Sequence, residues 1–178
     1  MRRGGFTLME VNLAMFIMAV GTLGLISLYT LGYRENRQSL EDVRGAVVAE
    51  SNMSQLIAAL SSTNLTWSTW TSIDEIPSGG WKKYAGTENE EDGGDDVKPL
   101  SNPTGQARSD FENIMSKCGF SGTFEDGGGL AIGLVVIRDY NDHGDRMSIA
   151  MRSGLRDGTL LYQPLYFTEV RFQGLKDQ

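Results

Sequence analysis

The apolar residues of this chain are concentrated near its N-terminus. The 23 residues from Val11 to Tyr33 contain no charged side chain, and most of them are aliphatic or aromatic. At about 1.5 Å per residue, a helix of this length crosses the ~30 Å hydrocarbon core of a bilayer. The run is longer than the apolar part of a secretory signal peptide, and no small-residue cleavage site follows it. The pattern therefore predicts a permanent membrane span.

The helical pattern continues beyond the span. Apolar residues recur at steps of three and four from Leu40 to Leu60, and polar residues occupy the other faces. We therefore expect one helix from about Thr7 to Ser61. Its membrane-spanning half covers residues 6–33, and its amphipathic half covers residues 34–62.

The stretch at 63–128 shows no clear period and is expected to be a variable loop region. Its segment 88–96 carries six acidic residues and no basic ones, which indicates a solvated loop. The polar loop is expected to continue through Arg108, and only a short helical turn is expected, at 111–115. Three aromatic residues are expected to pack against the long helix: Trp67, Trp70 and Trp81.

After Gly129 the hydrophobic period changes to two, which is typical of strands. The first strand is expected to be central, because it is an apolar run with one glycine. An Asp-Gly turn signal precedes the third. The predicted strands are 130–137, 147–151, 159–162 and 166–172. An antiparallel sheet at 129–178 packed on one long helix gives an α+β fold.

Composition excludes several function classes. The 16 basic and 23 acidic residues give a net charge of −7, which argues against a general nucleic-acid binder. The single cysteine, Cys118, excludes an intrachain disulfide framework, and the single histidine, His143, excludes zinc motifs that need two histidines. No nucleophile elbow, phosphate loop or metal-ligand set is found, so we expect no enzyme.

The residues that precede the span form a specific string. The segment from Arg2 to Val11, which reads RRGGFTLMEV, resembles the start of type IV prepilins and type II secretion pseudopilins. The resemblance implies a leader at 1–5 that the prepilin peptidase removes between Gly5 and Phe6, followed by methylation of the new amine on Phe6. It also implies that Glu10 forms a salt bridge with the N-terminal amine of an adjacent subunit. The fold expected from the resemblance is pilin-like, one long helix packed on a small antiparallel sheet.

The resemblance further implies where such a chain works and with what. We expect a single-pass protein of the bacterial inner membrane, with a cytoplasmic N-terminus and an extracytoplasmic C-terminal domain that later joins a periplasmic or surface filament. The expected partners are other pilin or pseudopilin subunits, the prepilin peptidase, the inner-membrane assembly platform and membrane lipid. A minor subunit is favoured, because the chain has no C-terminal cysteine pair. The pattern leaves open whether the machine is a pilus, a secretion system or a DNA-uptake system.

Two acidic segments are candidates for calcium. The turn after the first predicted strand places oxygen-bearing side chains at alternating positions, as a calcium loop does. These residues are Asp139, Asn141, Asp142 and Asp145. The closing glutamate of such a loop is missing, because its position holds Ala150. We therefore favour an ordinary polar turn, and we treat the acidic segment 88–96 as a solvated loop. No cofactor is expected.

A second interpretation of the N-terminus stays open. Glu10 lies at the edge of the span, where its carboxylate could remain at the level of the lipid head groups and have no partner. The chain would then be a single-span, membrane-anchored binding module that displays an acidic extracytoplasmic domain. The two interpretations differ in whether the chain joins other subunits through its N-terminal helix.

Overall fold

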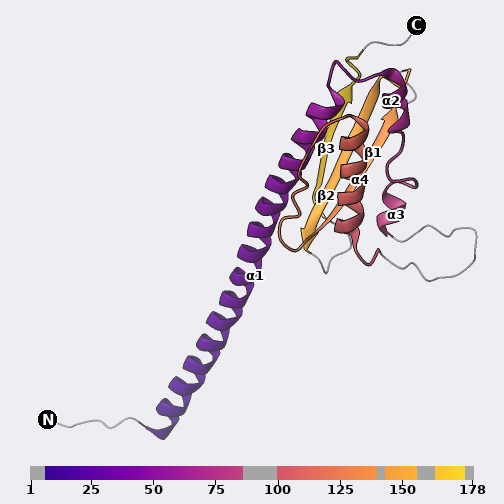
Figure 1. The fold of residues 1–178 in the computed structure, drawn as a ribbon. Helices are drawn as coiled ribbons and strands as arrows, with labels where there is room; N and C mark the ends of the chain where they lie inside the picture. Colours follow the sequence, from indigo (N-terminus) through magenta and orange to yellow (C-terminus); the bar gives the residue numbers. More distant parts are fainter. Residues whose placement is uncertain (1–6, 86–99, 140–142, 156–162, 175–178) are drawn as a thin grey trace, which may run out of the picture. The chain divides into compact units, whose positions relative to one another are not determined.

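The computed structural model describes residues 7–85, 100–139, 143–155 and 163–174. Within these ranges the chain forms four helices and three strands, which are labelled in Figure 1. In chain order they are α1 (Leu8–Leu60), α2 (Trp67–Ser72), α3 (Trp81–Ala85), α4 (Pro103–Lys117), β1 (Leu130–Asp139), β2 (Arg146–Leu155) and β3 (Leu165–Arg171). The chain divides into two units, residues 1–40 and 41–178, and α1 contributes to both. The predicted α+β, pilin-like class is confirmed.

Helix α1 is continuous over 53 residues, as the apolar pattern predicted. In the second unit one face of the helix is buried, and its members recur at three- and four-residue steps: Gly45, Val48, Ala49, Asn52, Met53, Leu56, Ala59 and Leu60. The helix lies close to β2 at Gly45, where an added Cβ would lie 2.6 Å from Ser153 Oγ. A glycine here therefore lets the helix backbone approach β2 closely.

The sheet is antiparallel in the order β1-β2-β3. Alternate residues of each strand face a core that is shared with α1 and α4. The strand residues of this core are Leu130, Ile132, Leu134, Val136, Met147, Ile149, Met151 and Val170. One long helix and a short one thus cover the same face of the sheet.

The region 63–128 contains more helix than the turn expected at 111–115, because α2, α3 and α4 lie within it. Helix α4 begins where a polar loop was expected. Its N-cap is Asn102, whose side chain accepts a hydrogen bond of 3.0 Å from the Gly105 N–H, and Pro103 follows at the first helical position. These capping residues resemble loop signals in the sequence, whereas the buried face of α4 depends on contact with β1.

The tryptophans occupy two different sides of the sheet. Trp70 is fully buried in the core, and its Nε1–H donates a hydrogen bond of 2.8 Å to the Gly144 carbonyl. Trp67 packs against the same core, as predicted. Trp81 instead joins a second cluster on the opposite face of the sheet, with Tyr84 and Val135. The prediction that Trp81 packs against the long helix is therefore wrong.

Strand β1 was expected to be central, but it lies at an edge of the sheet. Its burial has a different cause, because other segments cover its outer edge. Ile76 and Val136 exchange two backbone hydrogen bonds of 2.8 and 2.6 Å, and the Tyr84 hydroxyl lies 3.0 Å from the Leu134 carbonyl oxygen. The Thr104 hydroxyl bridges two further backbone groups of β1 at 2.9 and 3.2 Å. The predicted strand at 159–162 lies outside the described residues.

Candidate functional site

The N-terminus of α1 is capped by three hydrogen bonds between Thr7 and Glu10. Oε2 of Glu10 accepts from the Thr7 backbone N–H at 2.8 Å and from the Thr7 hydroxyl at 2.9 Å. The Glu10 backbone N–H donates in return to the Thr7 hydroxyl oxygen at 3.3 Å. This is a capping box, which satisfies orphan donors in the first turn of a helix. Glu10 therefore has a role in its own chain that the sequence analysis did not assign.

The capping box leaves part of the Glu10 carboxylate available. Both hydrogen bonds converge on Oε2, and Oε1 accepts none from the residues that the structure describes. The whole first turn of the helix is exposed, and Leu8 and Met9 have about four-fifths of their surface accessible, at 80% and 83%. A cation can therefore reach Oε1 without displacing the cap.

One face of the span forms a shallow apolar hollow next to this carboxylate. The hollow measures about 400 Å³ and is lined by Glu10, Val11, Ala14, Met15 and Met18. Ala14 lies one turn after Glu10, and its small side chain leaves a depression between the larger side chains beside it. Small residues on a membrane helix let a second helix approach closely. The carboxylate thus lies at the end of a surface suited to helix packing.

Polar side chains within the span differ in whether their hydrogen bonds are satisfied. The hydroxyls of Thr22, Ser27 and Thr30 donate to carbonyls three or four residues earlier at 2.8 to 3.0 Å, which suits an apolar environment. The Asn12 side chain makes no hydrogen bond to any residue that the structure describes. An amide in hydrocarbon favours a partner on a neighbouring helix.

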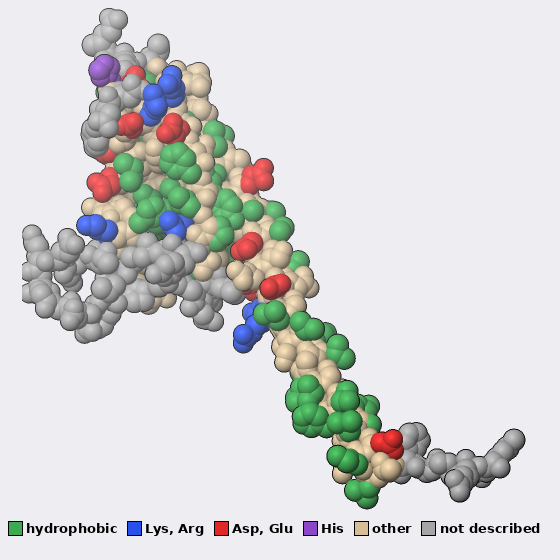
Figure 2. Space-filling model, turned by 180° about the vertical axis from the view of Figure 1, so that it is seen from behind, with side chains coloured by type: hydrophobic (Ala, Val, Ile, Leu, Met, Phe, Trp, Pro, Cys, Tyr) green, Lys and Arg blue, Asp and Glu red, His purple; other side chains and the backbone are tan. Residues whose placement is uncertain are grey.

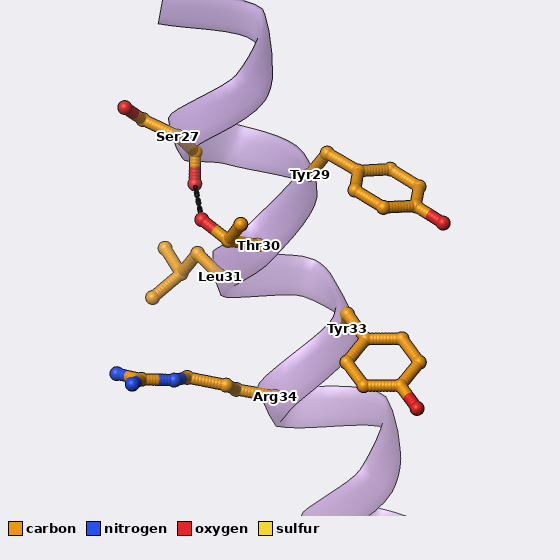
Figure 3. Close-up of a pocket in the computed structure, with 6 residues that line it drawn as sticks. All are labelled: Ser27, Tyr29, Thr30, Leu31, Tyr33 and Arg34. Atoms are coloured by element: carbon orange, nitrogen blue, oxygen red, sulfur yellow. Dashed lines mark hydrogen bonds between the residues drawn. The ribbon is translucent and has the colours of Figure 1, made fainter.

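The other end of the apolar run carries two tyrosines and an arginine. Tyr29 and Tyr33 extend to one side of α1, one turn apart, whereas Leu31 and Arg34 extend to the other (Figure 3). These residues line a second hollow of about 520 Å³ on the helix surface. Tyrosine rings and arginines are enriched where a helix leaves the hydrocarbon. In the described part of the chain, α1 alone is long and apolar enough to cross a membrane.

The predicted cleavage site, Gly5 and Phe6, lies outside the described residues. The calcium candidates are only partly described. Asn141 and Asp142 are outside the described ranges, Asp139 is the last residue of β1, and Asp145 directly precedes β2. Among the described residues no group of three or more acidic, histidine or cysteine side chains is placed to hold a metal. The calcium hypothesis therefore stays a prediction.

Two groups outside the N-terminus have pKa values that burial raises. Burial raises the pKa of the Cys118 thiol to about 11, so the thiol stays protonated near neutral pH. Burial also raises the pKa of the Asp110 carboxyl, while hydrogen bonds from Gln106 and Tyr84 oppose the shift. Neither group belongs to a metal-binding cluster in the described ranges. Both are consistent with packing roles.

Comparisons with known proteins bear on the N-terminal segment. Residues 1–26 match the model of the prokaryotic N-terminal methylation motif. No curated protein and no solved structure matches this chain. The match includes the predicted junction at Gly5 and Phe6, the capping pair Thr7 and Glu10, and most of the apolar run. The chain thus carries at its N-terminus the methylation motif that is the signature of type IV pilins and pseudopilins.

Proposed function

We propose that this chain is a structural subunit, a minor pilin or pseudopilin, of a type IV pilus-like or type II secretion filament. Prepilin peptidase removes residues 1–5 and methylates the amine of Phe6, and the mature chain assembles through α1. The observation that carries the proposal is the methylation motif at residues 1–26, which runs directly into an exposed apolar helix. The role is structural and not enzymatic.

The geometry at Glu10 supports assembly through charge pairing. Cleavage before Phe6 creates a positive amine four positions before Glu10 in the chain, and Glu10 itself lines the apolar hollow that favours helix packing. The amine of one subunit meets Oε1 of Glu10 in the next, while Oε2 keeps its cap on Thr7. Pairing the two charges offsets the cost of holding each of them in an apolar bundle.

The Asn12 amide independently supports assembly through α1. It has no hydrogen-bond partner among the described residues, although it lies inside the apolar run. A second helix in contact with α1 supplies such a partner, whereas lipid does not. The partners expected for the mature chain are therefore other pilin-like subunits, together with the inner-membrane assembly platform that inserts them.

Intact-protein mass spectrometry tests the processing step. The chain is expressed in a host with prepilin peptidase and extracted from the membrane. We expect a mass that corresponds to loss of residues 1–5 and gain of one methyl group on Phe6. A Gly5→Leu variant is expected to keep its leader, because a side chain at this position blocks close approach to the protease. A mature species that still carries Arg2 and Arg3 would overturn the proposal.

The capping box also favours a second candidate function, a membrane-anchored binding module. In this case Glu10 only closes its own helix, and the acidic domain acts as a tethered monomer. Both functions allow cleavage, so assembly distinguishes them. Crosslinking with partner subunits in sheared and membrane fractions is expected for a filament subunit and absent for a tethered monomer.

A further inference from the structure

The outer edge of β3 carries unpaired backbone groups. In an antiparallel ladder, successive residues direct their N–H and C=O groups alternately to either side. The Val136 groups face outward, since they pair with Ile76, and its register partner Ile149 therefore bonds to β3 at Thr168. The outward groups of β3 are those of Leu165, Phe167, Glu169 and Arg171. No hydrogen bond joins them to any residue that the structure describes.

The two edges of the sheet therefore differ. The β1 edge is covered by Ile76, Tyr84 and Thr104, which bond to outward backbone groups of Leu130, Ile132, Leu134 and Val136. Proteins usually protect sheet edges in this way, because an open edge is a template for pairing with another chain. The β3 edge has no such cover within the described ranges.

An apolar groove runs along the open edge. It measures about 630 Å³ and lies between β3 and the part of α1 in the same unit. Its lining consists of Ala46, Glu50, Met53, Ser54, Ile57, Leu165, Tyr166 and Phe167. Leu165 and Phe167 are 49% and 57% exposed, and hydrophobic side chains gather on the face of this unit seen in Figure 2. A strand on this edge would therefore have apolar contacts as well as backbone partners.

We propose that the β3 edge binds an extended segment of a partner protein, which adds a fourth strand to the sheet. Backbone hydrogen bonds to the four outward residues of β3 hold the segment, and apolar side chains at alternate positions contact the groove. Glu50 is the charged residue in the groove lining, so the segment carries a basic residue at this point. The proposal does not depend on filament assembly, since a tethered monomer presents the same edge.

Site-specific photocrosslinking in cells tests this proposal with the full-length chain. A benzophenone amino acid replaces Leu165 or Phe167, one position at a time, and the crosslinked peptides are sequenced. A strand on the edge gives crosslinks from the two positions to residues about two apart on one partner segment. Spacing of three or four would indicate a helix and would overturn the proposal.

The pair of variants Glu169→Ala and Glu169→Pro isolates the backbone contribution. Both lose the carboxylate, which lies 3.9 Å from Arg146, but only proline loses the outward N–H. We expect proline to lower the crosslinking yield at Phe167 about tenfold relative to alanine, the effect of one lost hydrogen bond. Equal thermal melting of the two variants shows that the domain remains folded.

Three results would contradict the proposal. The first is an equal crosslinking yield in the alanine and proline variants. The second is crosslinking from Phe167 to β3 of another copy of this chain, which would make the edge a self-association surface. The third is absence of crosslinks at both β3 positions while a probe at the exposed Val43 of α1 reacts.

Discussion

Asn52 of α1 and Glu125 exchange two hydrogen bonds of equal length. The Asn52 Nδ2–H donates to the Glu125 carbonyl at 2.9 Å, and the Glu125 N–H donates to Asn52 Oδ1 at 2.9 Å. One turn later, Gln55 makes the same pair of bonds with Thr123, both at 3.0 Å. The two side-chain amides act like peptide groups of a neighbouring strand. They fix the segment before β1 along the helix.

Removing the Asn52 amide is expected to destabilise the fold. Asn52 is fully buried, so Asn52→Ala leaves both backbone groups of Glu125 without their partner, at a cost of roughly 2–4 kcal/mol. Asn52→Asp keeps the acceptor and loses the donor, and is expected to be intermediate. Gln55→Ala exposes its partners to water and should cost less than about 1 kcal/mol. Urea unfolding of the full chain in detergent, monitored by tryptophan fluorescence, measures the loss of stability in each variant. Equal losses for Asn52→Ala and Gln55→Ala would contradict this account.

Two substitutions separate the capping role of Glu10 from its proposed role in assembly. Glu10→Gln keeps a side chain that caps the helix, because glutamine serves in a capping box, but it removes the charge. We expect this variant to insert and to be cleaved, but to fail to enter filaments. Thr7→Val removes the hydroxyl from the cap and leaves the carboxylate, so it is expected to assemble.

Co-purification with partner subunits from sheared fractions measures both variants, and the mass of each reports its cleavage. Glu10→Leu is expected to behave as Glu10→Gln does, and to insert slightly better because a carboxylate is absent. If Thr7→Val is excluded from filaments and Glu10→Gln enters them, helix capping and not charge pairing is the function of Glu10.

The Tyr84 hydroxyl lies between two oxygens and has one hydrogen to donate. It is 3.0 Å from the Leu134 carbonyl oxygen and 3.2 Å from Asp110 Oδ2. The hydroxyl can donate to one of these oxygens at a time, and protonation of Asp110 would end the competition, because the carboxyl would then donate to Tyr84 while Tyr84 donates to Leu134. Gln106 donates to the other carboxyl oxygen at 2.9 Å. Burial raises the pKa of Asp110, against the effects of its hydrogen bonds and of the Lys83 charge.

The raised pKa of Asp110 determines how the stability of the fold changes with pH. The folded carboxyl holds its proton more tightly than the unfolded one. Its contribution to the stability of the fold is therefore fully present below about pH 4. It is lost as the pH rises through the folded pKa. Asp110→Asn mimics the protonated form and does not ionise. We expect the melting temperature of this variant to rise relative to the wild type between about pH 4 and pH 7. A difference that is constant with pH, or that falls, would show that Asp110 is ionised in the fold.

Calcium is expected to have little effect on stability. The turn at 139–145 lacks the closing glutamate of a calcium loop. Thermal melting of the full chain in chelator and then in millimolar calcium should give the same midpoint. Calcium at about 100 times its dissociation constant would add roughly 2.7 kcal/mol. A rise of several degrees that Asp139→Ala and Asp142→Ala abolish would identify a calcium site.

Some features of the N-terminal site could be read from the sequence, and others were overlooked. The position of Glu10 follows from a short motif in fixed register, and the junction at Gly5 and Phe6 stays a prediction from the same motif. The capping role of Thr7 was also readable, because a threonine three residues before a glutamate is the signature of a capping box. The hollow beside Ala14 could not be predicted from the motif, since it depends on the sizes of neighbouring side chains on the folded helix.

The sequence by itself determined the long helix, its apolar span and the strands β1, β2 and β3. These features depend on local periods of hydrophobic residues, which one element carries along its own length. Only the tertiary structure decided that β1 is an edge strand, that α4 packs on it and that Trp81 lies on the opposite face. The outer edge of β1 is covered by Ile76 and Thr104, which are distant in the chain. Contacts between distant segments leave no local period, so a pattern of apolar residues reports that a strand is buried and not what covers it.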